Sequence, residues 1–85
     1  MDKNIINIAL IGLGRIGQMH AENLINHPEF NLKYIFDIDK KLSKKLSKKY
    51  QSTSIESPSI ALKDKSIKSI FISTSTKTHL KFIKE

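Results

Sequence analysis

Apolar and polar residues along the chain form two alternating patterns, short β-branched runs and amphipathic stretches. The run over 5–11 (I-I-N-I-A-L-I) is almost continuously apolar, which is typical of a parallel strand covered on both faces. Residues 15–26 have helical spacing, and Pro28 ends that helix because a proline disfavours helix in the residue before it. A second β-rich run over 32–37 follows, so the first part of the chain predicts a parallel βαβ unit.

The second part of the chain repeats this alternation. Asp39 can cap a helix whose apolar residues recur at Leu42, Leu46 and Tyr50, while six lysines occupy the solvated positions. A weak strand over 51–55 and a short helix with a serine cap and a proline in its first turn, Ser57-Pro58, come next.

The run over 67–74 (I-K-S-I-F-I-S-T) predicts a fourth strand, and the residues after it predict the start of a last helix near Thr78 and His79. The order β-α-β-α-β-α-β-α is that of an α/β fold, a partial doubly wound parallel sheet. In this reading the fourth strand keeps an open edge, because no fifth strand follows.

A glycine-rich loop, G-L-G-R-I-G, joins the first strand to the first helix and holds all three glycines of the chain. Gly12, Gly14 and Gly17 have the spacing of the dinucleotide fingerprint. Gly12 permits the tight turn, Gly14 leaves room for a pyrophosphate, and Gly17 lets the helix approach the strand. Backbone N–H groups around Arg15 and Ile16 would face the phosphates, and the Arg15 side chain either contacts a phosphate or is an exposed cation.

Asp37 ends the second strand 20 residues after Gly17. A carboxylate at this position accepts hydrogen bonds from the hydroxyls of an adenosine ribose and repels a 2′-phosphate, which favours NAD over NADP. The alternative is that Asp37 only begins the turn before the Asp39 cap.

Composition removes several other classes of function. The 85 residues contain no cysteine, which excludes a disulfide scaffold, a zinc ribbon and a thiol nucleophile. The net charge of +7 raises nucleic acid as a partner, but all except one of the 15 cations are lysines and no aromatic residues interleave with them. We therefore expect no nucleic-acid partner. No apolar run is long enough for a membrane span, and the absence of a leader-like start predicts a cytoplasmic protein.

The histidines and carboxylates do not form a recognisable catalytic or metal-binding pattern. His20 and His27 lie seven residues apart, which is not the pairing that helical metal ligands favour. No Ser/His/Asp triad or pair of acid and base carboxylates can be assembled, so we expect neither a metal site nor a catalytic residue within the chain.

Asp37 and two longer segments of the chain carry a family resemblance. The segments are I-A-L-I-G-L-G-R-I-G-Q-M-H-A-E-N-L (8–24) and I-F-I-S-T-S-T-K-T-H (70–79). They resemble the N-terminal domain of the glucose-fructose oxidoreductase, inositol dehydrogenase and rhizopine catabolism (Gfo/Idh/MocA) family, and inositol 2-dehydrogenases in particular. The resemblance implies a Rossmann-type sheet with strand order 3-2-1-4. It also implies that Ser73, Thr74 and Thr76 line the dinucleotide cleft, with His79 either near the nicotinamide or acting as a helix cap.

The family implies an NAD-dependent dehydrogenase that transfers hydride between a cyclitol or sugar, such as myo-inositol, and the cofactor, commonly in a homo-oligomer. A Glu-Lys-Pro motif with a catalytic lysine and a second domain with a catalytic Asp and His do not occur in this chain. We therefore expect residues 1–85 to form the N-terminal part of a dinucleotide-binding domain, without turnover of its own. The competing hypothesis is a non-catalytic nucleotide-binding sensor module.

Overall fold

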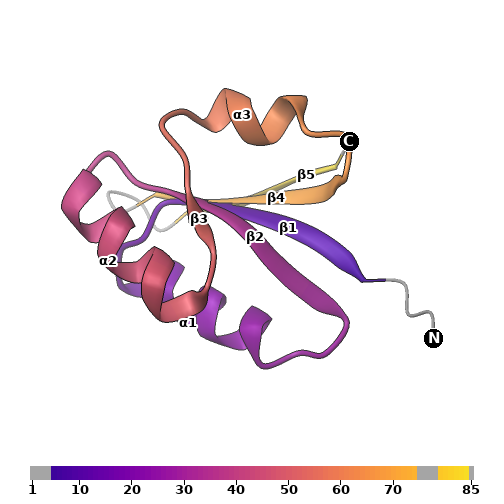
Figure 1. Ribbon diagram of the computed structural model, residues 1–85, viewed down its shortest axis with the longest axis horizontal. Helices are drawn as coiled ribbons and strands as arrows, with labels where there is room; N and C mark the ends of the chain where they lie inside the picture. The colour runs from indigo at the N-terminus through magenta and orange to yellow at the C-terminus, as the bar shows by residue number, and fades with distance from the viewer. Residues whose placement is uncertain (1–4, 75–78, 85) are drawn as a thin grey trace.

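The computed structural model describes the backbone of residues 5–74 and 79–84, and the side chains of 5–73. Helices and strands alternate along most of this length (Figure 1). In chain order they are β1 (Ile6–Ile11), α1 (Arg15–Ile25), β2 (Phe30–Phe36), α2 (Lys40–Tyr50), β3 (Thr53–Ser54), α3 (Pro58–Lys63), β4 (Ile67–Thr74) and β5 (His79–Lys84).

The strands form one sheet in the order β3-β2-β1-β4-β5. β1 pairs in parallel with both β2 and β4, and β2 pairs in parallel with β3. The predicted α/β fold, a parallel sheet in the order 3-2-1-4 with the first strand in its centre, is therefore confirmed.

The prediction of a last helix is wrong. His79–Lys84 is strand β5, which pairs antiparallel with β4 from Thr74↔His79 to Ser69↔Lys84. The expected open edge of β4 is therefore covered. The pairing satisfies a row of backbone N–H and C=O groups along β4 that an open edge would leave unpaired. Leu80, Phe82 and Ile83 also belong to residue types that are common in strands.

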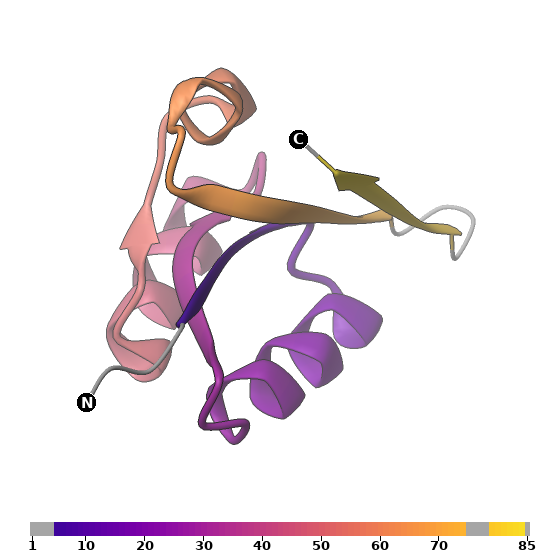
Figure 2. The ribbon, with the colours of Figure 1, turned by 90° about the vertical axis from the view of Figure 1, so that its right-hand side faces the viewer.

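Helices cover both faces of the sheet, with α1 and α2 on one side and α3 on the other (Figure 2). The alternation of side chains along β1 serves both layers, because Ile8 and Leu10 pack with α1 and α2 while Ala9 packs with α3. These three side chains are at most 2% exposed. The strand is therefore covered on both faces, as its continuous apolar run predicts.

Helix α1 presents a different face to the sheet from the one its large apolar residues suggest. Its buried residues are Gly17, Ala21 and Leu24, whereas Met19 is 55% and Ile25 40% exposed. Gly17 must lie against the loop that precedes the helix, and this contact turns the face with the small residues inward. The small face allows α1 to lie close to the sheet near the end of β1.

The predicted caps of the two later helices are confirmed. Asp39 Oδ1 accepts from the Leu42 N–H at 3.2 Å at the start of α2, and Ser57 Oγ accepts from the Ser59 N–H at 3.2 Å at the start of α3. Both bonds satisfy backbone donors that a helix leaves free in its first turn. No helix within the described residues is long and apolar enough to cross a membrane.

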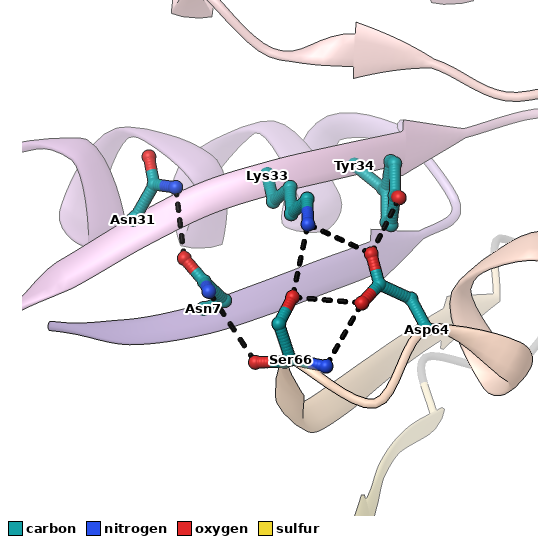
Figure 3. Close-up of polar contacts among 6 residues, drawn as sticks. All are labelled: Asn7, Asn31, Lys33, Tyr34, Asp64 and Ser66. Carbon is teal, nitrogen blue, oxygen red and sulfur yellow. Dashed lines mark hydrogen bonds and ion pairs between the residues drawn. The ribbon is translucent and has the colours of Figure 1, made fainter.

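A β-bulge organises a polar cluster that links the strands to the segment after α3 (Figure 3). The β1–β2 register steps from Ile8↔Leu32 to Ala9↔Tyr34, so Lys33 is the extra residue. As a result Lys33 and Tyr34, although adjacent, both reach Asp64. The Lys33 ammonium lies 2.8 Å and the Tyr34 hydroxyl 2.6 Å from Asp64 Oδ2, and the Ser66 N–H and hydroxyl donate to Oδ1.

These donors make Asp64 sensitive to acid. Hydrogen bonds from Lys33, Tyr34 and Ser66 hold the pKa of Asp64 well below its ordinary value of 3.8. A carboxyl group with a lowered pKa in the folded state stabilises the fold above its unfolded-state pKa, and that contribution is lost as the pH falls through 3.8 and below. Urea unfolding at pH 7 and near pH 3 should therefore show a loss of stability in acid that is reduced in Asp64→Asn.

Glu56→Gln is the matched control for this prediction. Glu56 Oε1 lies 2.9 Å from the Lys40 ammonium in a pair with exposed side chains, and such pairs contribute little to stability. This variant should keep most of the pH dependence of the parent chain. An unchanged acid response in Asp64→Asn would show that the cluster does not stabilise the fold in the way described.

Candidate functional site

The carboxyl ends of β1, β2 and β4 lie at one edge of the sheet, and the candidate residues follow these ends. Gly12 follows β1, Asp37 follows β2, and Thr74 is the last residue of β4. The Gly12 N–H donates to the Phe36 carbonyl at 2.8 Å, which joins the ends of β1 and β2. Ligands of open α/β sheets bind at this edge.

Two of the three glycines are required by the fold itself. Gly12 has φ +102°, and a Cβ at this position would lie 1.7 Å from the Ser73 carbonyl oxygen. A Cβ at Gly17 would lie 2.1 Å from the Gly12 carbonyl oxygen. A side chain at Gly12 would push the end of β1 away from the end of β4, and one at Gly17 would push α1 away from the end of β1. These three segments can therefore pack together only when both positions are glycine.

Gly14 has no such internal requirement. Its φ of −71° and ψ of −168° are open to every residue, and it occupies the N-cap position of α1. It provides no side-chain cap, and the first turn of α1 has no acidic residue. Among the described residues, no partner satisfies the first backbone N–H groups of α1. Such free donors attract an anion, and a glycine at this point lets that anion come close.

Asp37 is bonded to the glycine loop rather than merely beginning a turn. Its Oδ1 accepts from the Leu13 N–H at 3.1 Å and its Oδ2 from the Asp39 N–H at 3.1 Å. Each carboxylate oxygen can accept a second hydrogen bond, so the group can hold the loop and still receive ribose hydroxyls. The two aspartates are thus distinct, with Asp39 as the cap of α2 and Asp37 as the link to the loop.

Two residues of this edge were missed by sequence reasoning. Gln18 Nε2 donates to the Leu13 carbonyl at 3.0 Å, so the Leu13 backbone is held on both sides. Ile38 is 86% exposed immediately after Asp37, a large apolar side chain at the surface. Gln18 has no signal in the sequence, because a glutamine in a first helical turn is ordinary. Ile38 could have been noticed as an apolar residue between two aspartates.

The other predicted site residues lie at the start of α1, at the end of β4 and beyond it. Arg15 is exposed and Ile16 partly buried at the start of α1, and Ser73 is 7% exposed, with its carbonyl against Gly12. Thr74 ends β4, and Thr76 lies outside the described residues. His79 begins β5, so its predicted place at the start of a helix is wrong.

The histidines of α1 and of the turn after it have aromatic neighbours. The His20 ring lies 6.4 Å from the Phe71 ring, and the His27 ring lies 4.6 Å from that of Phe30. Among the described residues, no three His, Cys, Asp or Glu side chains lie together in a way that could hold a metal ion.

A parallel sheet in the order 3-2-1-4, a glycine loop leading into an uncapped helix, and a carboxylate at the end of β2 define a Rossmann-type dinucleotide-binding domain. A sequence profile of the GFO_IDH_MocA family, an oxidoreductase family with an NAD-binding Rossmann fold, matches residues 6–85. The chain belongs to this family.

Individual relatives agree with this assignment. The chain is 36% identical over 86 residues to the uncharacterized oxidoreductase YrbE of Bacillus subtilis (strain 168), an alignment that covers all of this chain and 25% of YrbE. It is similar to a myo-inositol dehydrogenase from Corynebacterium glutamicum, with 32% identity and a TM-score of 0.76 over 88% of this chain and 22% of that one. A probable dehydrogenase from Thermotoga maritima gives 31% identity and a TM-score of 0.77 over 87% and 22%. The chain thus spans about a quarter of the length of its curated relative.

Proposed function

We propose that residues 1–85 form the N-terminal part of an NAD-binding domain and bind the adenosine and pyrophosphate portions of the cofactor at the edge that holds Gly12, Gly14 and Asp37. The observation that carries the proposal is Gly14. Its backbone does not require glycine, yet it stands at the amino end of a helix without a side-chain cap. A bound phosphate would need the space that a side chain at this position would fill, and it would take the place of the missing cap by accepting from the free N–H groups of the helix.

The roles of the surrounding residues follow from their positions. The N–H groups of Gly14, Arg15 and Ile16 donate to phosphate oxygens, and the Arg15 side chain adds a positive charge. Asp37 accepts from the adenosine ribose through the lone pairs that Leu13 and Asp39 leave free. The exposed Ile38 supplies an apolar surface for the adenine. Ser73, Thr74 and Thr76 are proposed to line the dinucleotide cleft, and His79 to lie near its nicotinamide end.

The proposed cofactor is NAD rather than NADP. The Asp37 carboxylate would repel a 2′-phosphate on the ribose that it binds. This repulsion disfavours the extra phosphate of NADP.

For the whole enzyme we propose hydride transfer between a cyclitol or sugar, with myo-inositol the leading candidate, and NAD. The similarity to the Corynebacterium glutamicum myo-inositol dehydrogenase supports this substrate class. When bound, the nicotinamide supplies the hydride acceptor, and the residues of this chain hold and orient the cofactor. The groups that bind and deprotonate the substrate are proposed to lie outside residues 1–85.

Calorimetric titration of the chain with NAD and NADP tests the cofactor assignment, and a double variant tests its cause. Asp37→Asn with Ile38→Arg removes the carboxylate charge, adds a cation beside it and keeps an oxygen that can accept from Leu13. The ratio of NADP to NAD affinity should rise at least about tenfold, equivalent to ~1.4 kcal/mol.

Asp39→Asn is the matched control for the double variant. It removes a carboxylate two residues away, and asparagine caps a helix as well as aspartate does, so the cofactor preference should not change. If the parent chain already binds NADP more tightly than NAD, the proposed role of Asp37 is wrong.

A further inference from the structure

The Gln18 side chain turns back from the first turn of α1 towards the glycine loop. Its Nε2 donates to the Leu13 carbonyl at 3.0 Å in a partly buried bond. The Gln18 backbone N–H donates to the Gly14 carbonyl at 2.8 Å. Two successive carbonyl groups of the loop are therefore directed at this one residue.

The two peptide planes of the segment Gly12-Leu13-Gly14 are each held by a side chain. Every peptide bond in the described residues is trans, so the C=O and N–H of one peptide group point in opposite directions. Asp37 holds the first plane through the Leu13 N–H, and Gln18 holds the second through the Leu13 carbonyl. With that carbonyl turned towards Gln18, the Gly14 N–H points the opposite way. It has no hydrogen-bond partner within the part of the chain that the structure describes.

We propose that Gln18 is a positioning residue of the dinucleotide site, which fixes the direction in which the Gly14 N–H meets a phosphate oxygen. The inference rests on the proposed function. Glycines on both sides of Leu13 give this segment wide backbone freedom, so without the Gln18 bond the second peptide plane can rotate. A donor that is already oriented need not be ordered when the ligand binds.

A glutamine is suited to this task for a chemical reason. Its amide N–H can donate to a carbonyl while the group carries no net charge. A carboxylate of the same size could not donate and would stand close to the proposed phosphate site. Gln18 can therefore orient the loop without opposing the charge of the ligand.

The test compares two ligands and three chains. Gln18→Met keeps the length and most of the volume of the side chain but has no donor. We expect NAD affinity to fall about tenfold in this variant, while the affinity for adenosine, which carries no phosphate, stays within about twofold. Asn23→Leu, at an exposed position on α1 that makes none of the described hydrogen bonds to the loop, is the matched control and should bind both ligands as the parent does. Calorimetry measures NAD binding, and an NMR titration measures adenosine.

The outcomes separate this inference from the proposed function. Equal NAD affinity in Gln18→Met and the parent chain overturns the inference alone, and so does an equal loss for NAD and adenosine, which would indicate general stabilisation of the fold. A parent chain that binds no NAD overturns the proposed function as well. If Gln18→Met is unfolded by circular dichroism, Gln18→Ala takes its place, because it removes the donor without adding a charge. A selective loss of NAD binding is the expected result, and retention of NAD binding is the contrary one.

Discussion

Gly12→Ala should leave the chain largely unfolded. The new Cβ would lie 1.7 Å from the Ser73 carbonyl oxygen, and the φ of +102° is strained for any residue with a side chain. Relief requires the end of β1 to move away from β4, which breaks the centre of the sheet. We expect a loss of more than about 4 kcal/mol, an exceptional value for one substitution and close to the whole stability of a small domain.

Urea unfolding followed by circular dichroism measures this effect. Gly17→Ala should behave similarly, because its Cβ would lie 2.1 Å from the Gly12 carbonyl oxygen. Normal cooperative unfolding of Gly12→Ala would mean that β1 and β4 do not approach each other at this point as described.

Gly14→Ala should fold but bind NAD much more weakly. Its φ of −71° suits alanine, and the N-cap of α1 loses no side-chain bond, so the free energy of unfolding should change by less than about 1 kcal/mol. The added methyl group would occupy the space that the pyrophosphate needs. We expect NAD affinity to fall at least about 30-fold, equivalent to ~2 kcal/mol of steric conflict.

Calorimetry on the parent chain and Gly14→Ala, each checked for folding by circular dichroism, measures this loss. Gly14→Ala and Gly12→Ala are controls for one another, since the same chemical change is expected to affect binding in one and folding in the other. Unimpaired NAD binding by a folded Gly14→Ala would place the pyrophosphate elsewhere.

The sequence predicted the parts of the fold that depend on local pattern. β1 was recognisable because a strand buried on both faces needs a continuous apolar run, and the caps Asp39 and Ser57 were recognisable because they bond within their own first turn. The last strand was not, because the segment of β5 contains apolar residues compatible with either structure. Its backbone pairing with β4, a tertiary contact, decided between the two.

For the candidate site too, the sequence predicted the residues that belong to a local pattern and not the contacts between distant segments. The glycine spacing indicated the loop and Asp37 its acidic partner, since both belong to a pattern of residue types. The hydrogen bonds of Asp37 and Gln18 to Leu13 depend on where side chains from β2 and α1 meet the loop in space, and the sequence carries no record of that. The bulge at Lys33 was hidden for the same reason, because it arises from pairing between strands.

An NMR titration of the uniformly ¹⁵N-labelled chain with NAD tests the central claim most directly. We expect saturable changes in the amide resonances of the glycine loop and the start of α1, Gly12 to Gly17, and of Asp37 and Ile38. The resonances of the surface around Asp64 and Ser66 should not change. Absence of binding at millimolar NAD, or changes centred on that opposite surface, would contradict the assignment of this edge of the sheet as the dinucleotide site.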